Sequence, residues 1–294
     1  MAEQQEYLTT KEVAALLRIK ERKVYDLAAS GEVPCSRALG KLLFPRRELE
    51  AWLQREGGHM AAPATAARPS VMLGSHDPLL EWAMLESRTG LASFLGGSHD
   101  GLERFAAGEG VAAGLHIHDS ATGQWNVPAV RARLAEGDCA LVEWAWRQRG
   151  LILPETLAGD VRELADLKGR SFAPRAGETG SQSLFETLLA QAGLAPDDIA
   201  NIAPARSEAD AVVAVTDGKA DAAFGLKCLA RRFRLAFVPL IDERFDLLVS
   251  RRAWFDPPLQ ALLEFCRRPE FAEKAGELGG YDVSGFGRVH FNSA

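Results

Sequence analysis

The sequence predicts an α/β protein with a small N-terminal head and a larger body made of two similar lobes. From Val71 onward, short apolar runs alternate with segments of helical periodicity. The pattern at 108–115 is echoed at 218–226, a repeat about a hundred residues apart that favours two lobes over one continuous sheet. Small residues and two prolines at 57–69, without apolar periodicity, indicate a linker. We expect a head at 1–56, a linker at 57–69 and a body at 70–294.

The composition is that of a globular protein large enough for two domains. Of the 294 residues, 47% are apolar and 25% are charged. No run reaches the length of a membrane span, and the acidic, polar start of the chain does not resemble a secretory signal. The four cysteines are scattered and form no C-x-x-C pair, which favours free thiols. We therefore expect a cytoplasmic protein without a membrane partner.

The charge is distributed unevenly along the chain. Residues 1–58 carry 10 Lys and Arg against 9 Asp and Glu, whereas residues 59–294 carry 24 against 31. A mildly basic head on an acidic body suits a chain whose head alone touches nucleic acid.

The sequence of the head predicts short helices and a hairpin. Thr9 and Glu12 form a capping box that opens the first helix, and the second helix is expected over 20–29. A hairpin at 36–44 turns at Gly40-Lys41, and Pro45 starts a third helix.

This order of elements resembles the excisionase- and MerR-type winged helix-turn-helix. The resemblance covers about residues 7–54 and rests on L-T-T-K-E-V-A-A-L-L, K-V-Y-D-L, G-E-V-P and F-P-R-R-E-L-E-A-W-L. It implies that the second helix enters the major groove of double-stranded DNA while the wing meets phosphate. A winged helix that binds protein remains the alternative. The candidate DNA contacts are Glu21, Arg22, Lys23 and Tyr25 on the helix and Arg37 and Lys41 on the wing.

The tetrapeptide Gly-Ser-His-Asp occurs twice in the body, each time between a strand and a helix. In the first copy Asp77 is the expected N-cap, with Pro78 at the first helical position. In the second copy Asp100 and Glu103 are expected to form a capping box. Each copy places a serine hydroxyl, Ser75 or Ser98, where the free N–H groups of a helix also point.

A third strand-to-helix junction lies at 170–183. A helix is expected to start near Ser181, and its first turn offers N–H groups and hydroxyls, with Arg175 just upstream. This combination suits an anion, although a well-capped turn with a solvated arginine explains it equally well.

The body resembles the type II periplasmic-binding-protein fold, and more narrowly the molybdate-binding-protein-like domains. The resemblance covers nearly all of residues 71–250, with 141–146 and 237–249 as the two crossings between lobes. Its motifs are G-S-H-D-P-L-L, A-G-L-H-I-H-D, T-G-Q-W-N-V-P, R-Q-R-G-L-I-L, P-R-A-G-E-T-G-S-Q, G-K-A-D-A-A-F-G-L and P-L-I-D-E-R-F-D-L-L-V. One departure is Gln182, which replaces the basic residue that usually closes the glycine loop.

The resemblance implies a molybdate or tungstate oxyanion in a cleft between the lobes, bound as an effector rather than as a cofactor. Arg175 is the only full positive charge expected there. The candidate ligand contacts are Ser75, His76, Ser98, Asn126, Arg175, Thr179, Gly180 and Ser181. A metal site on His116 and His118 is the weaker alternative to histidines that are hydrogen-bonded in the core. Ser, His and Asp in one tetrapeptide cannot align as a catalytic triad, so no enzyme is expected.

We interpret the chain as a homodimeric one-component transcription regulator that senses an oxyanion. A protein that buffers or delivers molybdenum species, with the head as a protein-docking module, is the competing class. In a third interpretation the regulator senses an organic anion or the molybdenum cofactor itself.

Overall fold

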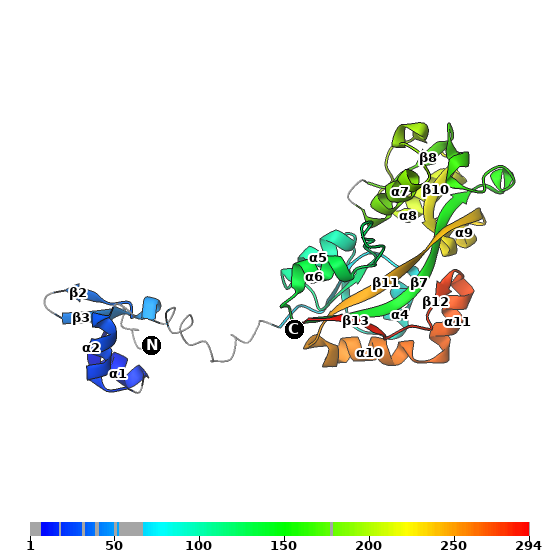
Figure 1. The fold of residues 1–294 in the computed structure, drawn as a ribbon. Coiled ribbons are helices and arrows are strands. Elements are labelled where there is room, and N and C mark those ends of the chain that lie inside the picture. Colours follow the sequence, from blue (N-terminus) through cyan, green and yellow to red (C-terminus); the bar gives the residue numbers. More distant parts are fainter. Residues whose placement is uncertain are drawn as a thin grey trace. The chain divides into compact units, whose positions relative to one another are not determined.

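The structure is a computed structural model, which describes residues 7–17, 19–30, 33–38, 41–49, 52, 67–176 and 179–293. The chain divides into two compact units, residues 1–67 and residues 68–294. We call them the head and the body and describe each by itself (Figure 1).

In its described residues the head combines helices with a three-stranded antiparallel sheet of order β1-β3-β2. The expected capping box is present, because Thr9 N donates to Glu12 Oε2 at 2.8 Å and Glu12 N donates to Thr9 Oγ1 at 3.4 Å. The sequence pattern did not predict β1, which pairs with β3. The described elements are β1 (Tyr7–Thr9), α1 (Thr10–Leu17), α2 (Glu21–Ala29), β2 (Ser36–Ala38) and β3 (Lys41–Pro45), and residues 46–49 are helical.

The body is built on one sheet of ten strands. Its main path runs β5-β4-β6-β11-β7-β10-β8-β9, and β12 and β13 both pair with β7. The strands are β4 (Val71–Gly74), β5 (Ala92–Phe94), β6 (Ala112–Leu115), β7 (Cys139–Leu153), β8 (Ser171–Ala173), β9 (Ala200–Asn201), β10 (Ala222–Leu226), β11 (Ala236–Ser250), β12 (Tyr281–Asp282) and β13 (Val289–Asn292).

The two expected crossings are the long strands β7 and β11. They pair with each other in antiparallel register from Cys139 opposite Ser250 to Leu153 opposite Ala236. Parallel strands β4, β5 and β6 lie on one side of this pair and β8, β9 and β10 on the other. We call these two sides lobe 1 and lobe 2. The expectation that the lobes would not share a continuous sheet is wrong, because the crossings hydrogen-bond to each other and join the two halves.

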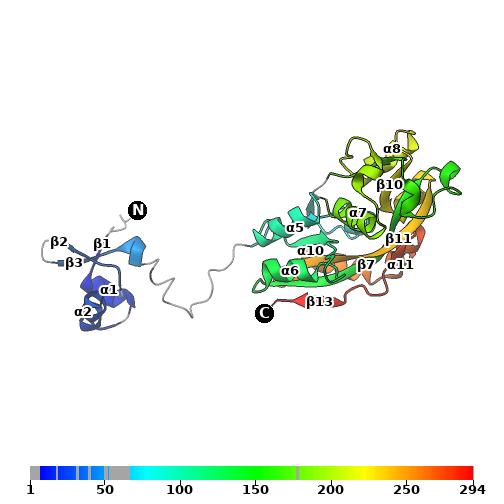
Figure 2. The same ribbon diagram turned by 45° about the horizontal axis from the view of Figure 1, so that its top comes forward.

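Helices cover the sheet in both lobes (Figures 1 and 2). In the described residues, no helix has both the length and the apolar character needed to cross a lipid bilayer. The α-helices of the body are α4 (Pro78–Glu86), α5 (Ser98–Ala106), α6 (Val127–Leu134), α7 (Gly180–Gln191), α8 (Glu208–Thr216), α9 (Lys227–Phe233), α10 (Pro257–Cys266) and α11 (Pro269–Leu278). Short 3₁₀ turns are η1 (Glu155–Leu157), η2 (Leu164–Leu167), η3 (Pro196–Asp198) and η4 (Ala253–Phe255).

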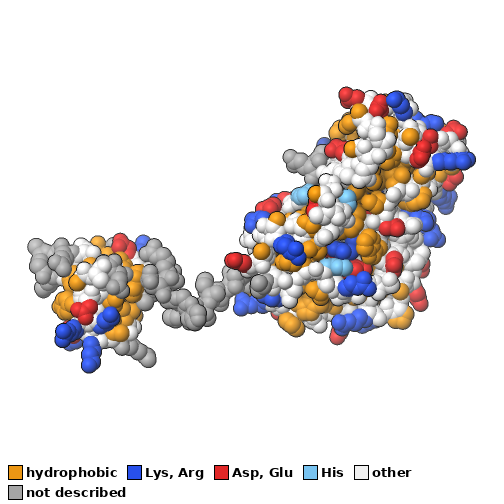
Figure 3. Space-filling model, viewed as in Figure 1, with side chains coloured by type: hydrophobic (Ala, Val, Ile, Leu, Met, Phe, Trp, Pro, Cys, Tyr) orange, Lys and Arg blue, Asp and Glu red, His pale blue; other side chains and the backbone are white. Residues whose placement is uncertain are grey.

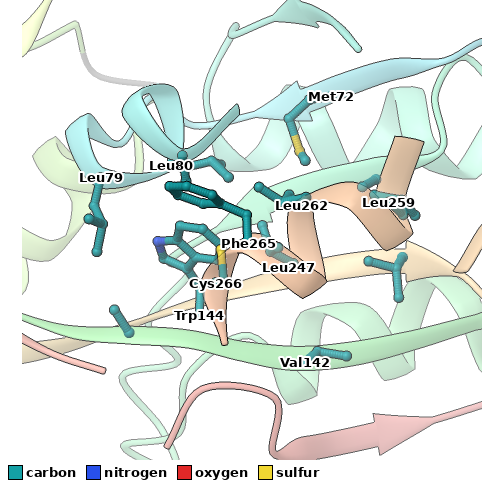
Figure 4. Packing of buried hydrophobic residues seen from close by; sticks show 14 of the residues in the cluster. Met72, Leu79, Leu80, Val142, Trp144, Leu247, Leu259, Leu262, Phe265 and Cys266 are labelled. Atoms are coloured by element: carbon teal, nitrogen blue, oxygen red, sulfur yellow. The ribbon is translucent and has the colours of Figure 1, made fainter. Parts of the chain in front are cut away.

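Each lobe has its own aromatic core. In lobe 1, Trp144 of β7 packs among residues of α4 and α10 (Figure 4), and its ring meets that of Phe271 edge-on at 5.1 Å. In lobe 2, the rings of Phe172 and Phe185 stack at 4.3 Å.

Candidate functional site

The two Gly-Ser-His-Asp copies fold differently. In the first, Asp77 caps α4 as expected, accepting a hydrogen bond from Leu80 N at 2.8 Å. In the second, α5 already begins at Ser98, and Gly97 is the N-cap with φ of 106°. The predicted capping box on Asp100 is therefore wrong, because a glycine with positive φ starts the helix earlier. Asp100 instead forms an ion pair with Arg104 at 2.9 Å.

The serines of both copies meet at the start of α4 and α5. The Ser75 and Ser98 hydroxyl oxygens lie 2.8 Å apart, and Ser98 Oγ also accepts a hydrogen bond from His116 N at 3.0 Å. All three residues are buried. The two hydroxyls thus lie together near the carboxyl end of β6, where the N–H groups of two helices are also directed.

Two buried arginines on β7 reach this region through Asp77 and Glu243. Arg147 and Arg149 are each 1% exposed, and their spacing of two residues puts both on one face of the strand. Arg147 pairs with Asp77 at 2.9 Å and with Glu243. Arg149 donates to Ser181 Oγ at 3.0 Å and to Glu208 Oε1 at 2.5 Å. Arg175 was expected to be the only full positive charge of the site, but Arg147 and Arg149 supply two others. Two arginines at this spacing in a mostly apolar strand were a signal that the sequence analysis did not use.

Glu243 on β11 is the partner that both arginines share. It lies directly opposite Arg147 in the β7–β11 register and is fully buried. Burial alone would raise the pKa of Glu243, but the guanidinium groups of Arg147 and Arg149 outweigh it and hold the pKa well below the usual value. Burial lowers the pKa of His116, although its Nδ1 lies 3.0 Å from Glu243 Oε2. Near neutral pH the carboxylate is charged and the imidazole is neutral.

These contacts form one polar network that spans both lobes. The serine pair leads through His116 and Glu243 to Arg149, and from there to Ser181 at the start of α7. We call the network the interlobe cluster and define it as Ser75, Asp77, Ser98, His116, Arg147, Arg149, Ser181, Glu208 and Glu243. It contains one more carboxylate than guanidinium.

Several buried atoms of the interlobe cluster have no well-aligned hydrogen-bond partner in the described part of the chain. They are His116 Nδ1, Arg147 Nε, Arg149 Nε and Glu243 Oε2. His116 Nδ1 and Arg149 Nε come within 3.0 Å and 2.9 Å of Glu243 Oε2, but at angles unsuited to hydrogen bonding. Such groups are costly to bury, and they offer hydrogen bonds to a ligand or to water.

The glycine loop before α7 contributes part of the expected set. Thr179 caps the helix by accepting from Gln182 N at 3.3 Å, and its own hydroxyl donates to Ala176 O. A Cβ added to Gly180 would lie only 3.3 Å from His116 Cε1, so the start of α7 closely approaches lobe 1. Arg175 is half-buried and donates through Nη1 to Ala205 O at 2.9 Å. Thr179 thus bonds within its own loop and Arg175 bonds to the segment before α8, whereas Gly180 borders the interlobe cluster and Ser181 belongs to it.

Asn126 and His76, two further expected ligand residues, also lie outside the interlobe cluster. Asn126 is fully buried, and its amide accepts from Ile117 N and donates to Asp246 Oδ2 at 2.8 Å. It therefore orders the interior of lobe 1 rather than presenting a free donor. The side chain of His76 is 52% exposed and pairs with Glu81 at 3.0 Å. His118 packs against Trp125, with ring centroids 4.8 Å apart, while His116 belongs to the cluster.

A cavity of about 330 Å³ adjoins the interlobe cluster in lobe 1. It lies between α4 and β5, and its lining combines apolar side chains with polar and charged ones. Ser75 and Asp77 form part of its wall, so the cavity reaches the polar groups of the cluster. Its volume is in the range of small-molecule pockets.

The candidate DNA-reading surface is the exposed face of α2. Glu21, Arg22 and Lys23 are exposed and Tyr25 is 51% exposed, while Val24 between them is fully buried. Burial of Val24 in the head core fixes which way its charged neighbours point. Lys and Arg side chains gather at the end of the head formed by α1 and α2 (Figure 3). The side chains of Arg37 and Lys41 on the wing lie outside the described residues.

Comparison with known proteins finds separate matches for the head and for the body. Residues 7–57 match a helix-turn-helix domain, and residues 81–267, more than half of the chain, match the PBP superfamily domain. The uncharacterized protein YvgK of Bacillus subtilis (strain 168) is 26% identical over 304 residues, which cover 96% of each chain.

Solved structures are also similar to this chain. A putative phosphate ABC transporter substrate-binding protein with bound phosphate, from Clostridium perfringens, is 11% identical with a TM-score of 0.52, over 72% of this chain and 98% of that one. Full-length CbnR complexed with its target DNA is 17% identical with a TM-score of 0.42, over 88% of this chain and 93% of that one. A helix-turn-helix joined to such a body fits a DNA-binding regulator with a ligand-sensing domain. The chain belongs to the family defined by the PBP superfamily domain, and a helix-turn-helix domain precedes that domain in the sequence.

Proposed function

We propose that this protein is a one-component transcription regulator whose body binds a small oxyanion, molybdate or tungstate, between its lobes. The observation that carries the proposal is the interlobe cluster, which connects Ser75 and Ser98 of lobe 1 to Ser181 of lobe 2 through buried charged groups. A ligand that engaged hydroxyls from both lobes would favour one arrangement of the lobes over others, and that change can be passed to the head.

The chemistry of the interlobe cluster suits an oxyanion. Ser98 and Ser181 lie in the first turns of α5 and α7, and Ser75 precedes α4, so each hydroxyl is close to the positive end of a helix dipole. Arg149 adds a charged donor next to Ser181. Neutral hydroxyls and a guanidinium already balanced by carboxylates favour binding that is specific but reversible.

For the head, we propose that α2 reads the major groove of double-stranded DNA through Arg22, Lys23 and Tyr25. Glu21 lies on the same exposed helix end, and Arg37 and Lys41 of the wing are proposed to contact phosphate. One small head offers few base contacts, so we propose a homodimer that reads a two-fold site. Sedimentation of the full chain at micromolar concentration tests the dimer, and a monomer would contradict it.

Calorimetry of the full chain with molybdate, tungstate, sulfate and phosphate tests the ligand. We expect molybdate and tungstate to bind and sulfate to bind poorly, because a cleft shaped for the larger anions leaves some donors out of reach of sulfate. Ser98→Ala should weaken molybdate binding by about 1.5 kcal/mol, the scale of a hydrogen bond to a charged group. Ser183→Ala, which changes an exposed serine of α7, is the matched control and should bind as the wild type does. Equal affinity for sulfate and molybdate would contradict the assignment.

A small organic anion is the second candidate, and the cavity in lobe 1 favours it. An apolar ligand body would fill the space between α4 and β5, while its charged group reached the interlobe cluster through Ser75. Ser93→Trp separates the candidates, since Ser93 lines the cavity on an exposed strand and a tryptophan would fill it. If Ser93→Trp no longer binds an organic ligand but binds molybdate as the wild type does, the organic ligand occupies the cavity and molybdate binds elsewhere.

A further inference from the structure

Glu208 holds a position that an oxyanion would need. Its Oε1 accepts a hydrogen bond from Ser181 Oγ at 2.7 Å and another from Arg149 Nη1 at 2.5 Å. The two donors are themselves 3.0 Å apart, so a single carboxylate oxygen bridges both. An oxygen of a bound oxyanion would need the same pair of donors.

We propose that Glu208 is a built-in competitor of the ligand: its carboxylate occupies the anion position formed by Arg149 and Ser181, and the ligand binds by displacing it. The inference rests on the proposed function and deepens it, because it assigns the position of one ligand oxygen. It also defines the ligand class as one that presents an anionic oxygen to this donor pair.

Among the carboxylates of the interlobe cluster, Glu208 is the one suited to leave. The side chains of Asp77 and Glu243 are 0% exposed, whereas that of Glu208 is 19% exposed. Asp77 caps α4, and Glu243 pairs with both arginines from the central strand β11. Glu208 lies in the first turn of α8, whose capping box uses Ser207 and Asp210 instead. Its side chain can therefore rotate toward solvent without breaking a helix cap or a strand pairing.

The charge of the interlobe cluster makes this displacement necessary for an oxyanion. With His116 neutral, its three carboxylates outnumber its two guanidinium groups. A dianion added to that set would meet uncompensated negative charge in a poorly solvated space. When the Glu208 side chain rotates away, the cluster loses one negative charge. The guanidinium of Arg149 and the hydroxyl of Ser181 then become available to the ligand. Glu208 thereby sets the ligand concentration at which the lobes respond.

Calorimetry of full-length variants with molybdate and with sulfate, at fixed pH and ionic strength, tests the proposal. Glu208→Gln keeps the shape and an acceptor oxygen but removes the competing charge, and Glu208→Ala removes the side chain. We expect both to bind molybdate at least about tenfold more tightly than the wild type. Glu155→Gln, an equal charge change on an exposed residue of lobe 2, is the control and should retain wild-type affinity. Loss of a merely structural contact would not raise affinity.

The outcomes separate this inference from the proposed function. If the wild type binds molybdate and neither Glu208 variant binds it more tightly, Glu208 is not a competitor, while the oxyanion assignment stands. If the wild type and both variants bind none of the oxyanions, the assignment and the inference both fail. Binding by the variants alone would support the inference most strongly, because the wild-type carboxylate would then hold the position against the added anion.

Discussion

Asp77 Oδ2 lies 2.9 Å from Arg147 Nη1, and this ion pair ties the start of α4 to the crossing strand β7. The same carboxylate caps α4 at Leu80 N, accepts from Trp144 Nε1 at 3.2 Å and accepts from Tyr281 OH at 2.8 Å. One buried side chain thus links a helix, a crossing strand and strand β12. Asp77 is therefore a structural member of the interlobe cluster as well as a helix cap.

Asp77→Asn should destabilise the body strongly. Asparagine can still cap α4, but Arg147 loses one of its two buried counter-charges, and breaking a buried pair costs about 3 kcal/mol or more. Urea denaturation followed by tryptophan fluorescence measures the loss. Asp217→Asn, which breaks an exposed pair with Lys219, is the control and should change the free energy of unfolding by less than about 1 kcal/mol. Equal losses of unfolding free energy in the two variants would contradict a special contribution of the buried Asp77–Arg147 pair to stability.

The stability of the body should fall in two stages as the solution is acidified. Burial lowers the pKa of His116 from its ordinary 6.5, so stability is full above pH 6.5 and is lost as pH falls through the lowered value. The pKa of Glu243 is held well below 4.5, so its contribution is full above pH 4.5 and is lost only as pH falls below that value. Unfolding free energies measured across this range should show both stages. In His116→Gln the first stage should vanish while the second remains, and a first stage that persists would assign it to another group.

Replacing Arg22 and Lys23 together by alanine should abolish specific DNA binding and leave the body unaffected. Both side chains are exposed on α2, so the head should fold without them. Lys41→Ala should instead weaken binding to all sequences alike and reduce its salt dependence, as expected of a phosphate contact. Gel-shift titrations with a selected operator and with random DNA measure both effects. Unchanged operator affinity in the double variant would remove α2 from the DNA interface.

Local signals in the sequence predicted much of the fold. The capping box of Thr9 and Glu12, the cap at Asp77 and the crossings β7 and β11 are confirmed. Each is encoded within a few neighbouring residues or in one apolar or alternating run. The start of α5 was predicted wrongly because Asp100 has the side chain of a typical N-cap. The helix instead starts after Gly97, whose φ is positive. Strands β1, β12 and β13 are short segments defined by their partners rather than by their own patterns.

The candidate site was less accessible to sequence reasoning. The serines were found because they lie beside helix starts, which leave a local signature. The sequence analysis did not identify Arg147, Glu208 and Glu243 as site residues. Their role depends on burial and on partners distant in sequence, such as Glu243 opposite Arg147. Asn126 was expected to contact the ligand, but an amide in a loop has the same sequence appearance whether it faces a ligand or the protein interior.

The most direct test of a ligand that bridges the lobes is a double-mutant cycle on molybdate affinity. Ser98→Ala removes a hydroxyl from lobe 1 and Ser181→Ala removes one from lobe 2, and calorimetry of the full chain gives the affinity of each variant and of the pair. If one anion contacts both hydroxyls, each single change should weaken binding about tenfold or more, and the double variant should bind hardly at all. Wild-type affinity in either single variant would mean that molybdate does not bind between the lobes at these serines.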